Sequence, residues 1–130
     1  MSFLLVAALL AADPEPTPKA VKPRELTGLT MNAAPAGPDK PWRLDGDERR
    51  LRAAIPDKAT REALMKAADL KKEEVLVFSW TGSGGDRLVP AEGKAGEAAF
   101  TYTPGKSGDK ARHLKFFAVP AKARVKVTRK

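Results

Sequence analysis

Apolar and polar positions alternate most clearly in the second half of the chain. Residues 74–80 place Leu76, Phe78 and Trp80 on one face and two valines on the other. A strand that is apolar on both faces is typical of the centre of a sheet, because both of its sides are covered. We therefore predict that residues 74–80 form the central strand.

Four later segments also show the period of a strand. In residues 111–119 the apolar side chains fall on both faces, and in residues 123–128 Val125 and Val127 alternate with polar side chains. The other two segments are residues 87–89 and 98–103. Short linkers rich in proline and glycine separate these strands. Because strands joined by such short turns pair antiparallel, we expect consecutive strands to be neighbours in one sheet.

A period near 3.6 precedes the strands. Leu51, Ala54 and Ile55 share one face of a predicted helix over residues 48–55, which Pro56 ends. A second predicted helix over residues 61–68 has a small apolar face suited to lying on a sheet. The sequence thus predicts an α+β fold: one or two short helices, then a small antiparallel β-sheet or β-sandwich of four to six strands.

The N-terminus has a different character. Residues 3–12 are an unbroken apolar run, too short to cross a membrane, which needs about 20 residues in a helix. The run fits a signal peptide over residues 1–12 with cleavage after Ala12, although the usual basic residue near the start is missing. The alternative is a short buried helix or strand. We predict export to the periplasm or the cell exterior, and no membrane span in the mature chain.

Seven of the eleven prolines fall within residues 13–41. Proline removes a backbone donor and favours extended backbone, so this stretch is not a helix. Its one apolar cluster, Leu26, Leu29 and Met31, predicts a short edge strand. The remainder is expected to be a spacer or disordered arm, and residues 42–130 are expected to form a single folded domain.

The amino-acid composition excludes several common kinds of catalytic site. The chain has no cysteine and one histidine, His113, so a disulfide, a thiolate nucleophile and a cysteine-rich zinc site are excluded. The net charge is +8, and residues 110–130 hold no acidic residue. That basic end is either a solvated face or a weak site for a polyanion. We expect no enzyme activity and no cofactor.

A glycine-rich segment, residues 81–86, follows the central strand. It lacks the spacing of a phosphate-binding loop and is followed by a strand, which argues against nucleotide binding. Two alternatives stay open: a hairpin loop with glycines at positive φ, or a loop kept small so that another backbone approaches closely. We assign binding of a protein partner to the loops at residues 81–86 and 104–110 and to the basic strands, through Ser83, Gly84, Gly85, Asp86, Lys106, Arg112 and Lys126.

The order of these features resembles small exported bacterial domains and, more distantly, the C-terminal domain of the protease-complex subunit PrcB. The resemblance covers residues 43–128 and rests on the lead-in Ala68-Asp69-Leu70-Lys71-Lys72-Glu73 and on the turn Gly84-Gly85-Asp86. It implies a non-catalytic accessory or interaction module of the cell envelope, associated with a protease. The alternative is a small envelope hydrolase or a carbohydrate- or polyanion-binding protein. A cleft lined by paired acids around His113 would favour the hydrolase.

Overall fold

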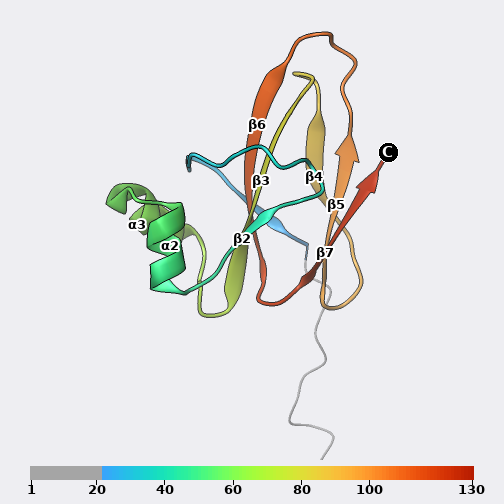
Figure 1. Cartoon of the computed structure of the whole chain (residues 1–130). Coiled ribbons are helices and arrows are strands. Elements are labelled where there is room, and N and C mark those ends of the chain that lie inside the picture. Colours follow the sequence, from blue (N-terminus) through green and yellow to red (C-terminus); the bar gives the residue numbers. More distant parts are fainter. Residues whose placement is uncertain (1–21) are drawn as a thin grey trace, which may run out of the picture.

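The computed structural model describes residues 22–130, which form three layers (Figure 1). Two helices cover one face of a four-stranded sheet of order β1-β6-β3-β2, and a three-stranded sheet of order β4-β5-β7 covers its other face. The elements within these residues are β1 (Arg24–Leu26), β2 (Trp42–Leu44), α2 (Glu48–Ala54), α3 (Lys58–Ala67), β3 (Glu73–Gly82), β4 (Arg87–Ala91), β5 (Glu97–Thr103), β6 (Ala111–Pro120) and β7 (Arg124–Arg129). The predicted α+β class is confirmed.

Strand β3 lies in the middle of the fold. It pairs antiparallel with β6 over ten residues, with Phe78 opposite Lys115. Val75 and Val77 pack toward the helices, whereas Leu76, Phe78 and Trp80 pack toward the three-stranded sheet. The predicted phase of this strand is therefore confirmed.

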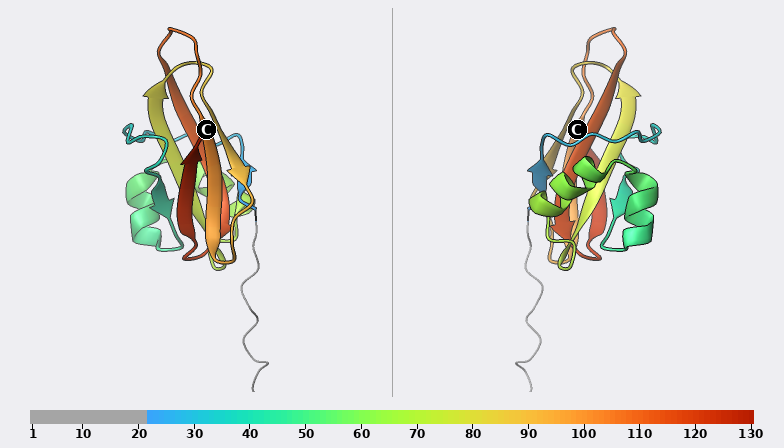
Figure 2. Two further views of the ribbon diagram at one scale, coloured as in Figure 1. Left: turned by 90° about the vertical axis from the view of Figure 1, so that its right-hand side faces the viewer. Right: turned by 90° about the vertical axis from the view of Figure 1, so that its left-hand side faces the viewer.

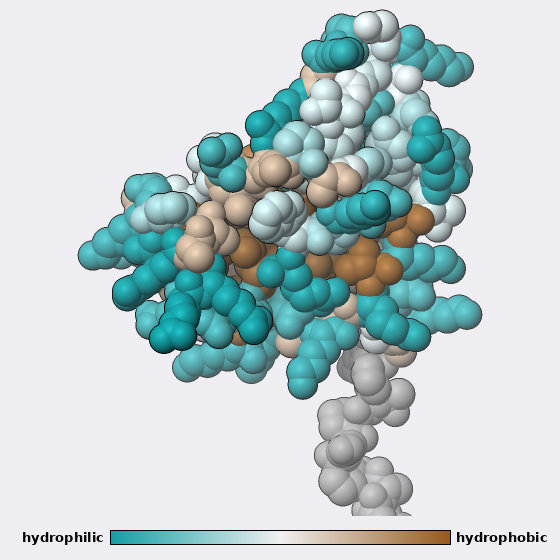
Figure 3. All heavy atoms as spheres, in the orientation of Figure 1, coloured by the Kyte–Doolittle hydropathy of each residue, from teal (hydrophilic) through white to brown (hydrophobic). Residues whose placement is uncertain are grey.

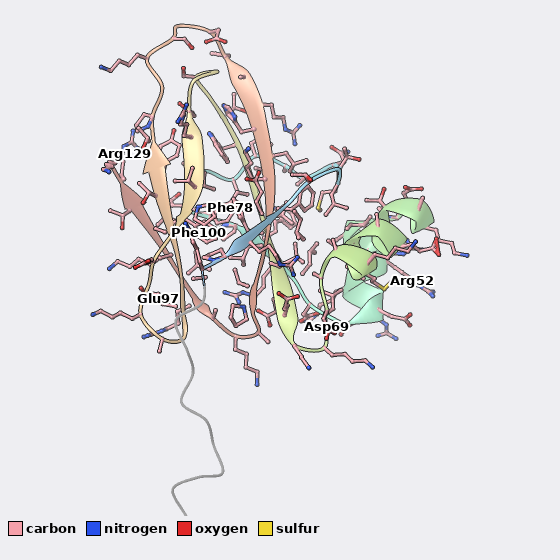
Figure 4. The ribbon with its side chains drawn as sticks, turned by 180° about the vertical axis from the view of Figure 1, so that it is seen from behind. Arg52, Asp69, Phe78, Glu97, Phe100 and Arg129 are labelled. Atoms are coloured by element: carbon pink, nitrogen blue, oxygen red, sulfur yellow. The ribbon has the colours of Figure 1, made fainter. Side chains whose placement is uncertain are left out.

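Three phenylalanines join the two sheets. Phe78 lies edge-on to Phe100, with ring centroids 4.8 Å apart, and Phe117 completes the group at 4.8 Å from Phe100 (Figure 4). Edge-to-face contacts of this kind are favourable beyond the apolar area that they bury. These rings fix how the two sheets face each other.

Both helices begin at an aspartate. Asp47 accepts hydrogen bonds from the N–H groups of the first turn of α2, and Asp57 accepts from the backbone and hydroxyl of Thr60 in α3. These bonds lower the pKa of the Asp57 carboxyl. Because Asp57 is the cap, α3 starts at Lys58 rather than at the predicted residue 61. Leu64 of α3 is fully buried against the sheet.

The predicted pairing of consecutive strands is wrong at three connections. The chain changes sheets from β3 to β4, from β5 to β6 and from β6 to β7, and β7 then pairs parallel with β5 (Figure 2). The reason is that β3 and β6 already pair with each other along their whole length, and each carries a row of apolar side chains that needs a second sheet to cover it. A short connection across the end of the sandwich meets this need.

The predicted domain boundary at Trp42 is also wrong. Residues 24–26 pair with β6, which confirms the predicted edge strand, and Ala33 is only 1% exposed. Beyond Ala33, the N–H groups of Ala36 and Gly37 donate to the Ser79 carbonyl of β3. Proline prevents a helix here but allows an extended chain to lie across the sheet, so the segment is part of the fold rather than a spacer.

The predicted signal peptide, residues 1–12, and the first part of the predicted spacer lie outside the described residues. Within residues 22–130, neither helix has the length and apolar character needed to cross a membrane.

Candidate functional site

Two loops that are far apart in the sequence meet at one end of the sandwich, at the top of Figure 1. Residues 83–86 join β3 to β4, and residues 104–110 join β5 to β6; we call these two loops together the tip. A Cβ placed on Gly105 would lie 2.5 Å from the carbonyl carbon of Gly85, closer than real atoms approach. The two backbones can touch only because residue 105 is glycine.

The geometry of the tip bears on the two alternatives for the glycine-rich segment. No glycine of residues 82–85 has a positive φ, so the hairpin explanation is wrong. A Cβ on Gly82 would meet the Asp86 carboxylate and one on Gly84 the Asp109 carboxylate, so these two glycines leave room for side chains of the tip. The close approach of the two backbones depends on Gly105, because a Cβ on Gly85 would lie 3.5 Å from Gly105 Cα, an ordinary contact.

Asp86 holds the tip together. One carboxylate oxygen accepts hydrogen bonds from Trp80 Nε1 at 3.1 Å and from the Tyr102 hydroxyl at 3.0 Å, and the other accepts from Gly105 N at 2.7 Å. The Gly105 N–H lowers the pKa of the Asp86 carboxyl most; burial opposes this, and the Trp80 and Tyr102 donors reinforce it. Two strands, β3 and β5, and the loop that holds Gly105 thus converge on one side chain.

Aromatic rings support the Asp86 carboxylate from below. Trp80 stacks on His113 at 4.7 Å and lies edge-on to Tyr102 at 6.0 Å, and the Arg129 guanidinium lies 5.4 Å from the centre of the Tyr102 ring. Burial raises the pKa of Tyr102, and its bond to Asp86 adds to the increase. The result is a base in which the Trp80 indole N–H and the Tyr102 hydroxyl share one acceptor, the Asp86 carboxylate.

His113 is part of the same base. Its Nε2 lies 2.7 Å from the Ser83 carbonyl oxygen. A carbonyl only accepts hydrogen bonds, so this nitrogen carries a proton and donates. The histidine therefore binds the backbone of the first loop and does not face the Ser83 hydroxyl.

A second set of bonds links the loops near their exposed ends. The hydroxyls of Ser83 and Ser107 lie 2.7 Å apart, and Ser107 donates in turn to Asp109. Gly84 N also donates to Asp109, at 3.3 Å. The Ser107 hydroxyl, followed by the Gly84 N–H, lowers the pKa of the exposed Asp109 carboxyl.

The predicted binding residues do not form one site. Five of them lie on the tip: Ser83, Gly84, Gly85, Asp86 and Lys106. Arg112 lies on β6 below the tip and donates to the Ala33 carbonyl. Lys126 lies on the outer face of β7, where its neighbour on β5 is Ala99.

The sequence pointed to residues 104–110 as a contact loop, which contains Gly105 and Ser107, but it gave no role at this site to Trp80 or Tyr102. It treated His113 only as a catalytic candidate. The Pro104-Gly105 pair was a visible signal of a turn, but nothing in the sequence placed that turn against residues 82–86, because Asp86 and Gly105 are 19 positions apart.

Other surface features lie away from the tip. A shallow groove between α2 and α3 is lined by Leu51, Arg52 and Met65, among others. The large exposed apolar side chains within residues 22–130 are Trp42, Met65 and Val89, which lie on three different elements. In the described part of the chain, no three histidine or acidic side chains gather as a metal site requires.

Comparison with protein-family models, with curated proteins and with solved structures finds no match for this chain. The resemblance to the C-terminal domain of PrcB stays a prediction. The argument about function therefore rests on the geometry of the tip.

Proposed function

We propose that the chain is a non-catalytic interaction module that binds a protein partner through the tip. The observation that carries the proposal is the convergence of three donors on Asp86, which fixes the two loops relative to each other before any partner arrives. Loops on a rigid sheet are a frequent place for recognition. A surface that is already ordered loses little conformational entropy on binding, which favours affinity.

The shape of the tip favours a protein over a small molecule. Small ligands bind in concave and largely apolar pockets. The tip projects from the end of the sandwich (Figure 2), and its exposed residues are Gly84, Gly85 and all of residues 106–110. Such a projection suits the surface of a second protein. The apolar run at residues 3–12 and the resemblance to PrcB favour a role in the cell envelope, in association with a protease.

The hydrolase alternative has less support. Its acids would need to face a substrate, but the Asp86 carboxylate is engaged by three donors and Asp109 by two. Its histidine would need to face a hydroxyl, but His113 donates to a backbone carbonyl. The geometry at the tip serves to order the loops.

The test is site-specific crosslinking in the organism that expresses the protein. A photoreactive amino acid replaces Lys106 on the tip, and the matched control replaces Lys94, an exposed lysine in the β4–β5 loop. We expect a discrete crosslinked partner from position 106, competed away by purified wild-type chain, and none from position 94. Equal yields from the two positions would contradict the proposal and move the interface to the basic strands between Arg112 and Lys130, whose binding would weaken with salt.

A further inference from the structure

Strand β7 has one unpaired side. It is the last strand of the three-stranded sheet and pairs only with β5, in parallel. Among residues 22–130, no strand pairs with its other side. An unpaired strand edge presents a row of N–H and C=O groups that can bind another extended chain.

The hydrogen bonds to β5 show which groups of β7 are open. Arg124 N donates to the Gly96 carbonyl and Lys130 N to the Tyr102 carbonyl, both at 2.9 Å. Successive N–H groups of a strand point to alternate sides, so the even-numbered residues of β7 face β5. Val125, Val127 and Arg129 therefore direct their main-chain groups to the open side.

The side chains beside this edge separate into two rows. Val125 and Val127 are half-buried against the core between the sheets, and Arg124, Lys126 and Thr128 are exposed on the outer face. Figure 3 shows apolar surface over β7, bordered by hydrophilic side chains. An added strand would extend the inner apolar row and place its outer side chains next to the basic row.

The charge of the basic row is available to a partner. Lys126 lies opposite Ala99 on β5, which cannot neutralise it, whereas Arg124 lies opposite Glu97. Residues 122–130 hold no acidic residue. A second copy of β7 would set positive charges against positive charges across the ladder, which is unfavourable. The complementary occupant carries acidic side chains.

We propose that the open edge of β7 binds an extended segment of a partner protein as an added strand, and that this segment alternates apolar with acidic residues. Main-chain bonds to Val125, Val127 and Arg129 supply affinity, and alternate side chains supply specificity. The apolar residues of the segment cover Val125 and Val127, and its acidic residues lie beside Lys126. This surface is separate from the tip, so either proposal can fail alone.

The probe is a blocked peptide of alternating valine and glutamate, six residues long like β7. It is titrated into the full ¹⁵N-labelled chain. We expect saturable shifts and slower hydrogen exchange at the amides of Val125, Val127 and Arg129. A peptide with lysine in place of glutamate should not bind. A peptide with N-methylated valines should also fail to bind, because it lacks N–H donors for the ladder. If the N-methylated peptide binds as tightly as the first peptide, charge alone explains the binding and the proposal is overturned.

Two variants test the residues of the edge. Lys126→Glu should weaken binding of the glutamate peptide about tenfold, because an attractive pair becomes repulsive. Lys66→Glu on α3 changes the net charge equally and should leave binding unchanged. Val127→Pro removes an outward N–H that β5 does not use and should also abolish binding. Since a proline can disturb folding, Lys126→Glu carries the test by itself: affinity equal to that of Lys66→Glu would refute the proposal.

The free chain supplies a final test. If the amides of Val125 and Val127 are already protected at low protein concentration, another segment of this chain occupies the edge. If their protection rises with protein concentration, a second copy occupies it. Either result would overturn the proposal, and fast exchange at every concentration would support it.

Discussion

Replacing Asp86 with alanine tests the organisation of the tip. The change removes the acceptor of three hydrogen bonds, two of them from residues that are almost fully buried, Trp80 at 2% and Tyr102 at 7% exposure. A hydrogen bond to a charged group contributes about 1.5–3 kcal/mol, and a buried donor left unpaired carries the full desolvation cost. The Gly105 N–H lies near solvent and regains water. Counting mainly the two buried donors, Asp86→Ala should lower the free energy of unfolding by about 3–5 kcal/mol.

The measurement is urea unfolding followed by far-ultraviolet circular dichroism. The matched control is Asp109→Ala, which removes a carboxylate from the same tip whose donors, the Ser107 hydroxyl and the Gly84 N–H, are open to water. We expect a much smaller loss for this variant. Equal losses in the two variants, or an Asp86→Ala midpoint close to that of wild type, would refute the assignment of Asp86 as the residue that joins the loops.

The stability difference between wild type and Asp86→Ala is expected to depend on pH. The pKa of Asp86 lies below its ordinary value of 3.8 in the folded state, mainly because Gly105 N donates to it. Between the folded pKa of Asp86 and pH 3.8, the folded state therefore binds fewer protons than the unfolded state. The stabilisation that Asp86 supplies is present above pH 3.8 and is lost as the pH falls through the folded pKa. The stability difference between wild type and Asp86→Ala should narrow in that range. Asp57 is present in both proteins and no cause of its lowered pKa involves Asp86, so its titration cancels in the difference, whereas that of Asp109 changes because the Asp86 charge raises the pKa of Asp109.

Three further outcomes are expected. Phe78→Ala should lower the free energy of unfolding by about 3–5 kcal/mol, and Arg124→Ala by under about 0.5 kcal/mol; similar urea midpoints would contradict the strand phase. Gly105→Ala should lower the melting temperature strongly, because its Cβ would meet the Gly85 carbonyl carbon at 2.5 Å, whereas Gly85→Ala, with a nearest approach of 3.5 Å, should be mild. Intact mass of the natively exported protein should show a chain that begins near Asp13, and a retained Met1 would argue against cleavage.

The periodic spacing of apolar residues predicted the strands and helices well wherever that spacing follows from which side chains are buried. Strand β3 is apolar on both faces because it is covered by helices on one side and by a sheet on the other, and this leaves a direct trace in the alternation of Val77 and Phe78. The helices left a similar trace in the spacing of Leu51 and Ile55. A periodic pattern of this kind can be recognised within a few consecutive residues.

The division into two sheets left no such trace. A short turn between two strands is compatible with a hairpin and with a crossing from one sheet to the other, and the choice depends on which strands pair elsewhere. Here β3 pairs with β6 along its whole length, so the chain after Gly82 enters the second sheet. The fold of the proline-rich segment was missed for a related reason: Ala33 is buried by contacts with distant strands.

The candidate site was predicted in part. The glycines of residues 82–85 pointed to a special loop, and two backbones do approach closely there, but the glycine that permits the approach is Gly105 in the other loop. The partner of that approach and the convergence on Asp86 depend on Tyr102 and Gly105, which belong to another strand and another loop. Sequence spacing holds no information on a contact of that kind.

The pairing of β1 with β6 has a consequence for the order in which the chain folds. Glu25 on β1 forms an ion pair with Lys115 on β6, 90 positions later in the chain. Contacts of such separation close a large loop, and folding slows as the average separation of contacts grows. Strand β1 therefore has no strand to pair with until β6 is present. During synthesis, β1 stays unpaired until residues 111–120 have been made, and Leu26 is without its place in the core for all of that interval.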